Sequence, residues 1–393
     1  MDRFEERAIL SGLGQSDVGR RLGRSGLDLT LEACCNALDD AGLSPRDIDG
    51  LSAWPGDVFV SEGFSGPGIS QIQDALRLEL TWYTGGPETP GQLGAVVNAM
   101  MAVATGLCRH VLVYRTVTES SAQHGAGRAG VLSVDVPRLP TYQQWSVPFG
   151  SISSATWIAQ YASRYMHEFG LTREQLAQVP LTLRANAALN DKAVFREPLT
   201  LDDYLAARMI STPLCLFDCD VPVDGSTAII ISAAESAPDL RSTPLAIEAI
   251  GTALRDRPSW DQRSSLSTMA ATDAAAHLWS RTDLRPKDVD VAGLYDGFSI
   301  LTVLWLEAFG FFARGEAGDF LEDGARIARD GAIPINTGGG QLSAGRLHGF
   351  GHLHEVALQL RAQAGARQVA DARVGLVAAG GGPLAGAMML RRD

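Results

Sequence analysis

Apolar and polar residues follow two recurring patterns along the chain, one typical of buried strands and one typical of helices that pack on one side. Short apolar runs predict buried strands at residues 8–14, 110–115, 245–254 and 374–382. Apolar positions at helical spacing predict helices at residues 27–41, 94–106, 267–280 and 352–365. Strands and helices thus alternate, which is typical of an α/β protein.

One sequence pattern occurs twice. AGLSPRDIDGL (41–51) and TDLRPKDVDVAGL (282–294) share the order Leu, any residue, Pro, basic residue, Asp, aliphatic residue, Asp. Each copy follows a predicted helix and leads into a predicted strand, and a second helix and strand follow later in the same order. The repetition predicts two pseudo-equivalent βαβαβ halves, with sheets covered by helices.

The domain boundaries follow from this repetition. We expect a first half at residues 1–237 and a second half at 245–393, joined by the linker PDLRSTP. Residues 116–212 interrupt the first half as a long insertion, and insertions of this length tend to carry function. Its aromatic residues are expected in the core or in dimer contacts, with one or two lining a pocket for a flat apolar substrate: Tyr142, Trp145, Trp157, Tyr161 and Tyr165.

Composition and charge exclude several classes of function. The 393 residues, 46% of them hydrophobic, can bury a large core. A net charge of −12 without a basic cluster argues against nucleic acid as a partner. No apolar run reaches the roughly 20 residues needed to span a membrane, and the acidic start MDRFEERAIL is unlike a signal peptide. We therefore expect a cytoplasmic protein.

The five cysteines have no spacing typical of a disulfide framework or a zinc site. They are Cys34, Cys35, Cys108, Cys215 and Cys219. An odd number of cysteines in a reducing compartment predicts mostly buried thiols.

The stretch NTGGGQLSAGRLHGFGHLHE (336–355) is the strongest candidate for chemistry. Glycines 338 to 340 let the backbone approach a ligand, and the helix that follows directs its amide groups toward an anion or oxyanion. A tight strand-to-helix turn is the alternative. His348 and His352 are four residues apart, as in helical metal sites, but the glycines between them argue against regular helix, so His348 is interpreted as a hydrogen-bond partner in a cleft.

Three segments carry a resemblance to a known family. GLYDGFSILTVLWLEAFGF (293–311), the stretch 336–361 and VDGSTAIIIS (223–232) resemble the thiolase superfamily, and within it the thiolase-like lipid-transfer-protein branch. The resemblance covers essentially the whole chain. It implies the thiolase fold, a layered αβαβα sandwich, and a homodimer paired through the sheet next to the helix at 94–106.

The sequence departs from thiolases at the catalytic positions. The resemblance places Leu93 where thiolases carry their nucleophilic cysteine, and residues 378–384 contain no second cysteine. Arg346 replaces the histidine of the Gly-His-Pro motif, and Tyr295 replaces the histidine that lipid-carrier thiolases place before Asp-x-Phe. Because a leucine forms no acyl-enzyme, covalent thioester chemistry is not expected.

This combination resembles the retro-aldolases of steroid side-chain breakdown. The resemblance implies cleavage of a β-hydroxyacyl-CoA with a tertiary hydroxyl to a ketone plus acetyl- or propionyl-CoA, with no metal and no cofactor beyond the CoA of the substrate. It also implies a small partner subunit with an OB-like fold and a zinc ribbon, in a two-plus-two complex. Two alternatives remain: a non-catalytic lipid or acyl-CoA carrier or scaffold, and an atypical thiolase-like acyltransferase with a reactive cysteine elsewhere.

Retro-aldol chemistry assigns roles to the candidate residues. Tyr295 is the expected base or acid, and Arg346 is expected to lower its pKa and to stabilise the enolate, since a guanidinium cannot release a proton. His348 is an alternative proton donor. Asp296 is expected to orient Tyr295 or to cap the next helix. The remaining candidates are predicted to bind substrate or the oxyanion: Gly339, Gly340, Ser343, which is otherwise a cap, and Tyr83, which borders the cleft with the loop 85–90.

Overall fold

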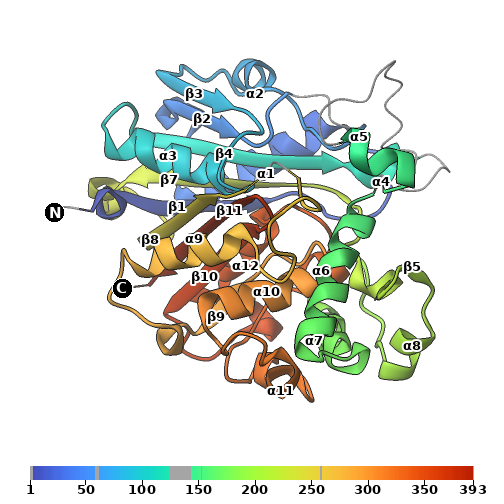
Figure 1. Ribbon diagram of the computed structural model, residues 1–393. Helices are drawn as coiled ribbons and strands as arrows, with labels where there is room; N and C mark the ends of the chain where they lie inside the picture. Colours follow the sequence, from blue (N-terminus) through green and yellow to red (C-terminus); the bar gives the residue numbers. More distant parts are fainter. Residues whose placement is uncertain (1–2, 58–61, 124–142, 152, 257–258, 393) are drawn as a thin grey trace.

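Nine strands form one continuous mixed sheet with helices on both faces (Figure 1). The computed structural model describes residues 3–57, 62–123, 143–151, 153–256 and 259–392. The strands stand in the order β3-β2-β4-β7-β1-β8-β11-β10-β9. Their bounds are β1 Ala8–Gln15, β2 Gly50–Ala53, β3 Trp82–Gly85, β4 His110–Thr118, β7 Asp224–Ala233, β8 Leu245–Leu254, β9 Val291–Gly293, β10 Val374–Gly380 and β11 Leu384–Arg391.

The two halves of the chain meet where β1 pairs with β8, with Leu10 opposite Leu245. Outward from this junction the first half runs β1-β7-β4-β2 and the second runs β8-β11-β10-β9. In both halves the successive pairings are antiparallel, antiparallel and parallel. The expected α/β class with two pseudo-equivalent halves is confirmed.

Equivalent helices cover the sheet in each half. The longer helices are α1 Gly26–Ala41, α2 Ile69–Leu76, α3 Gly94–Ala104, α9 Ala270–Trp279, α10 Ser299–Phe309 and α12 Phe350–Leu360, with the short α11 Ala317–Leu321. The repeated sequence pattern forms equivalent 3-10 turns at Pro45–Asp47 and Pro286–Asp288. None of the helices in the described ranges is long and apolar enough to cross a membrane.

Close contact between helix and sheet depends on glycines in both halves. A Cβ atom on Gly14 of β1 would lie 2.0 Å from the carbonyl oxygen of Ala33 in α1. A Cβ atom on Gly251 of β8 would lie 2.0 Å from the carbonyl oxygen of Ala274 in α9. Only glycine fits at these positions, because any larger residue would push the helix off the sheet.

The insertion lies between β4 and β7, which pair directly with each other. Its described elements are α4 Glu119–Ala122, α5 Gln143–Ser146, α6 Ser154–Phe169, α7 Arg173–Ala188, α8 Leu201–Ala206 and the small hairpin β5 Met209–Ser211 with β6 Leu214–Cys215. Helices α6 and α7 pack on the second half of the chain, beside α10 (Figure 1).

Two of the predicted aromatic residues anchor the insertion on the second half. The Tyr165 hydroxyl donates to Glu307 Oε2 on α10 at 2.6 Å, and the Tyr161 hydroxyl donates to the carbonyl of Trp260 at 2.7 Å. Both tyrosines are fully buried, which confirms their expected place in the core. Trp145, in contrast, is exposed. Tyr142 lies outside the described residues.

Candidate active site

Three loops meet at the amino end of α3. A Cβ atom on Gly91 would lie 2.5 Å from the carbonyl oxygen of Ala379, and a Cβ atom on Gly349 would lie 2.7 Å from the Cβ atom of Ala379. The residue that precedes α3 is Leu93, which is fully buried. The helix entry at which a thiolase needs its nucleophile therefore presents an apolar side chain.

Arg346 lies in a buried cluster of charges beside these loops. Its Nε donates to Glu119 Oε2 at 2.9 Å, its Nη2 contacts the other oxygen of Glu119, and its Nη1 lies 3.6 Å from Asp220 Oδ2. Burial alone would lower the pKa of Arg346, but Asp220 and Glu119 outweigh it and raise the pKa overall. The positive charge is thus permanent and is shared with two carboxylates.

Tyr295 lies two residues after the end of β9 and is largely buried. The side chain of Asn336 fixes the residue before it: Asn336 Oδ1 accepts from the Leu294 amide at 2.7 Å and Asn336 Nδ2 donates to the Leu294 carbonyl at 2.9 Å. Tyr295 lies within electrostatic range of the guanidinium groups of Arg115 and Arg346 and, when ionised, favours their charged form. A phenol and two cations therefore belong to the same buried site.

The second cation, Arg115, ends the apolar core of β4 and is fully buried. It donates to the carbonyls of Phe64 at 2.6 Å and Thr116 at 2.7 Å, and its Nη2 lies 2.9 Å from His348 Nδ1. Its guanidinium also lies 4.8 Å and 4.9 Å from the ring centroids of Trp54 and Phe64. Burial lowers the pKa of Arg115, yet a guanidinium remains protonated at neutral pH.

Asp296 does not cap the helix that follows it. The residue before α10 is Phe298, and no side chain caps that helix. Instead, Asp296 Oδ2 accepts hydrogen bonds from the amides of Gln341 and Leu342, at 2.8 and 3.2 Å. The expected capping of α10 is therefore wrong, because the carboxylate faces the glycine loop of a distant segment rather than its own helix.

Asp296 also faces His352 on α12. The Nε2 atom of His352 lies 2.9 Å from Asp296 Oδ1, but the two groups are not aligned for a regular hydrogen bond. Both side chains are buried. Asp296 thus connects the loop that carries Tyr295 with the glycine loop and with α12.

The predicted oxyanion glycines are packed against other protein groups. Gly339 has a φ of 102°, and Gly340, with a φ of 58°, begins a π-helical turn, Gly340–Ala344. A Cβ atom on Gly340 would lie 2.1 Å from Asp296 Oδ2, and one on Gly339 would lie 2.5 Å from the Cβ atom of Ala187. Two amides that follow the glycines bind Asp296, so the loop is held by the protein itself.

The remaining predicted residues occupy different places. Ser343 is buried in the π-helical turn, and its hydroxyl accepts from Arg184 Nε at 2.9 Å. Tyr83 lies on β3, the outermost strand of the first half, and its side chain is 67% exposed. In the part of the chain that the structure describes, no hydrogen bond or ion pair connects Tyr83 with Tyr295 or Arg346.

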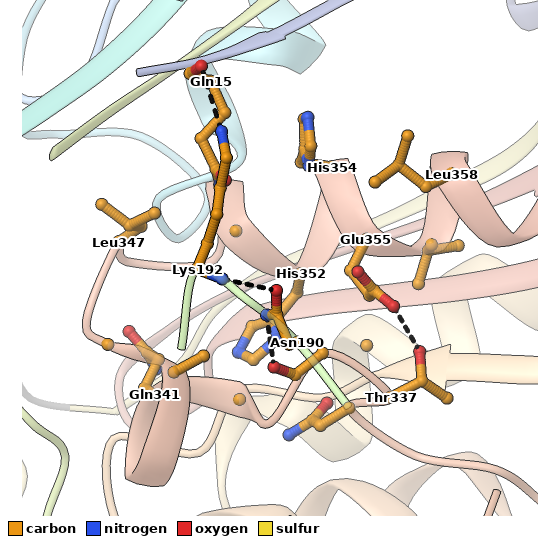
Figure 2. Close-up of a pocket in the computed structure, with 18 of the residues that line it drawn as sticks. Gln15, Asn190, Lys192, Thr337, Gln341, Leu347, His352, His354, Glu355 and Leu358 are labelled. Carbon is orange, nitrogen blue, oxygen red and sulfur yellow. Dashed lines mark hydrogen bonds between the residues drawn. The ribbon is translucent and has the colours of Figure 1, made fainter. Parts of the chain in front are cut away.

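A cavity of about 230 Å³ is lined by the glycine loop and by α12 (Figure 2). Its polar lining includes Lys192, Gln341, His352, His354 and Glu355. Burial lowers the pKa of His354 to about 4, so the ring is neutral at pH 7. Since the catalytic candidates at positions 295, 346 and 348 are not among the described residues that line it, this cavity is separate from the charge cluster.

Sequence reasoning missed three charged members of the site: Arg115, Glu119 and Asp220. Arg115 had a visible signal, because it ends the apolar run HVLVYR and a charge in a buried strand is costly without a role. Glu119 and Asp220 stand at opposite ends of the segment between β4 and β7. Nothing in their local sequence indicates that folding brings both to Arg346.

Three of the five cysteines are buried thiols. Cys34 and Cys108 are buried on α1 and just before β4, and Cys215 is buried on β6. Burial raises the pKa of Cys34, raises that of Cys108 to about 12 and raises that of Cys215 to about 11. These three thiols stay protonated at neutral pH, whereas the thiolate is the nucleophilic form.

Comparison with known proteins agrees with this geometry. Residues 252–390 match the family model of the thiolase C-terminal domain-like proteins. The chain is 35% identical to a steroid side-chain-cleaving aldolase of Thermomonospora curvata over 98% of both chains. It is also 35% identical to a 17-hydroxy-3-oxo-4-pregnene-20-carboxyl-CoA lyase of Mycobacterium tuberculosis, over 90% of this chain and 92% of that protein.

Solved structures show the same relationship. The structure described as the Ltp2-ChsH2(DUF35) aldolase superposes with a TM-score of 0.87 at 32% identity, over 99% of this chain and 98% of that one. Human mitochondrial 3-ketoacyl-CoA thiolase shares the fold, with a TM-score of 0.68 at 14% identity. The chain therefore belongs to the thiolase-like family that includes the two bacterial enzymes, the aldolase and the lyase.

Proposed function

We propose that this protein is a carbon–carbon lyase that cleaves a β-hydroxyacyl-CoA by a retro-aldol reaction, without a covalent intermediate and without a bound cofactor. The observation that carries the proposal is a buried phenol, Tyr295, within electrostatic range of the guanidinium groups of Arg346 and Arg115, in a chain with Leu93 at the position that the resemblance assigns to the thiolase nucleophile. Such a site offers proton transfer and charge stabilisation but no nucleophile.

The reaction needs one proton to move and one bond to break. A base removes the proton of the β-hydroxyl, the bond between the α and β carbons breaks, and the ketone leaves. The electron pair remains on the acyl-CoA as an enolate, which is protonated at the α carbon. Because the proton lost and the proton gained balance, one side chain, Tyr295, can accept the proton as a phenolate and return it to the α carbon as a phenol, while the cations stabilise the negative charge.

The substrate class follows from the relatives. Both bacterial relatives are named for the cleavage of steroid side chains or for a steroid acyl-CoA. For this chain we propose a steroid acyl-CoA with a tertiary hydroxyl on a ring carbon, cleaved to a ring ketone plus acetyl- or propionyl-CoA. Thiolytic cleavage requires a β-ketoacyl-CoA, and a tertiary alcohol cannot be oxidised to a ketone. Retro-aldol cleavage is therefore the route by which such a side chain can be removed.

The proposed assembly is a homodimer that binds two copies of a small partner subunit in the cytoplasm. Support comes from the related aldolase structure, which is described together with a DUF35 partner. The partner would combine an OB-like fold with a zinc ribbon.

The test is cleavage by the chain co-expressed with such a partner. The complex is incubated with 17-hydroxy-3-oxo-4-pregnene-20-carboxyl-CoA, and mass spectrometry follows the 17-ketone and propionyl-CoA. Tyr295→Phe should lower the rate at least about 100-fold, as expected for a lost acid–base group. Tyr165→Phe is the matched control, because its hydroxyl binds Glu307 in the core. Substrate binding without cleavage would instead favour a carrier or scaffold.

A further inference from the structure

The contact between Arg115 and His348 defines the protonation state of the histidine. Arg115 Nη2 lies 2.9 Å from His348 Nδ1. A guanidinium carries only donors, so His348 Nδ1 must accept the hydrogen bond. The neutral imidazole then holds its proton on Nε2, and the ring can donate a hydrogen bond only from that atom.

We propose that Arg115 is a positioning residue that locks His348 as a neutral donor through Nε2, and that His348 therefore takes up no proton during the reaction. The statement about the reaction rests on the proposed retro-aldolase function. The statement about the tautomer does not. Together they replace the interpretation of His348 as a proton donor in acid–base catalysis and leave proton transfer to Tyr295.

The charged groups next to His348 oppose its protonation. Arg115 faces the ring from β4, and Arg346 stands two residues before it on the same loop. An imidazolium would add a cation beside Arg115 and would break the bond from Arg115. The two carboxylates of the cluster do not compensate, because Glu119 binds Arg346 with both oxygens and Asp220 faces the same guanidinium at 3.6 Å.

The ring is also held rigidly. Its centroid lies 5.0 Å from that of Phe64 and 5.6 Å from that of Trp54, the same two rings that flank Arg115. The His348 amide donates to Gln341 Oε1 at 3.1 Å, and the backbone is in the left-handed region with a φ of 51°. A fixed ring in one tautomer is a preorganised hydrogen-bond donor, the kind of group that stabilises an enolate or a thioester oxygen.

Two substitutions of His348 distinguish a role as hydrogen-bond donor from a role as acid or base. Glutamine reproduces the arrangement of His348, with Oε1 accepting from Arg115 and Nε2 donating. Asparagine is too short to place a donor at the Nε2 position, although it tolerates the left-handed backbone better. We expect His348→Gln to keep activity within about tenfold and His348→Asn to lose at least about 100-fold, the effect of one lost oxyanion donor. Equal, large losses in both variants would overturn the proposal.

A spectroscopic measurement tests the tautomer independently of activity. In the full chain with 15N-labelled histidine, the His348 signals, identified by their absence in His348→Gln, should show the neutral Nε2–H form unchanged from pH 6 to 8. Arg115→Met removes both the donor and its charge and should make this histidine titrate, while circular dichroism confirms the fold. An Nδ1–H or imidazolium pattern in the unmodified chain contradicts the proposal, as does an unchanged pattern in Arg115→Met. If the tautomer is present but the steroid acyl-CoA is not cleaved, only the proposed function fails.

Discussion

Arg346 and Glu119 form a two-pronged ion pair across 227 residues of sequence, with Arg346 Nε 2.9 Å from Glu119 Oε2 and Nη2 on the other oxygen. Glu119 begins α4, directly after β4, and Arg346 stands in the loop before α12. The pair therefore joins the first half of the chain to the second inside the site, and both partners are largely buried.

Breaking this pair should destabilise the protein. Glu119→Gln removes the closer of the two carboxylates that Arg346 faces and leaves only Asp220, and breaking a buried ion pair costs up to about 3 kcal/mol. We expect a clear fall in the thermal denaturation midpoint, together with reduced cleavage activity. Asp74→Asn is the control: its partner Arg77 is paired at the surface, where both side chains are mostly exposed, so the midpoint should hardly change. Equal shifts in the two variants would contradict the structural role.

Gly340→Ala should disturb the site by contact, not only by backbone strain. The new Cβ atom would lie 2.1 Å from Asp296 Oδ2, so the loop next to Tyr295 must move. Gly365 has the same φ of 58°, but no atom would lie within 4 Å of an added Cβ atom. Gly365→Ala should therefore cost only the strain of a left-handed backbone, roughly 1–2 kcal/mol. We expect cleavage to be lost in the first variant and retained in the second, with both melting midpoints measured alongside.

Alkylation should separate the aldolase from an atypical acyltransferase. Burial raises the pKa of Cys108 to about 12 and of Cys215 to about 11, so neither is a thiolate at neutral pH. Treatment with a haloacyl-CoA should leave no adduct on these residues by intact mass, and activity should survive. The exposed Cys35 is the internal control for general thiol reactivity toward iodoacetamide. An adduct that requires the CoA group and abolishes activity would support the acyltransferase.

Stability should depend on pH through His354 in the wall of the cavity. Burial lowers its pKa to about 4 from an ordinary value of 6.5. Between these values the unfolded chain binds the extra proton, so stability is full above pH 6.5 and is lost as pH falls toward 4. His354→Gln should flatten this dependence when melting midpoints are compared from pH 4.5 to 7.5. His277→Gln, at an exposed position on α9, should leave the profile unchanged.

Much of the fold was predictable because hydrophobic periodicity and internal repetition are local signals. The pattern around Leu43 and Leu284 led to the two halves, and the helices α1, α3 and α12 lie where the periodicity places them. The glycine loop and Tyr295 were recognisable for the same reason, as continuous motifs. The contacts of these motifs could not be predicted in the same way. Local sequence places Asp296 next to a helix that it could cap, but in the fold it binds the amide of Gln341.

The charge cluster shows why the other residues of the site could not be predicted from the sequence. Arg115, Glu119 and Asp220 contact the loop 346–348 only because β4 pairs with β7 and brings the ends of the insertion together. Ion pairs of this kind depend on tertiary geometry and leave no spacing in the sequence. The place of Tyr83 on the outer strand β3 likewise follows from the sheet order and not from its local sequence.

Hydrogen bonds join the two ends of the segment between β4 and β7 to the sheet. Thr118 pairs with Asp224 at the end of the β4–β7 ladder, and Asp224 also accepts hydrogen bonds from the hydroxyls of Ser120 and Ser121. Closed in this way, the base of the segment places two carboxylates, Glu119 and Asp220, around Arg346. The sheet that carries the fold therefore also sets the charge balance of the site.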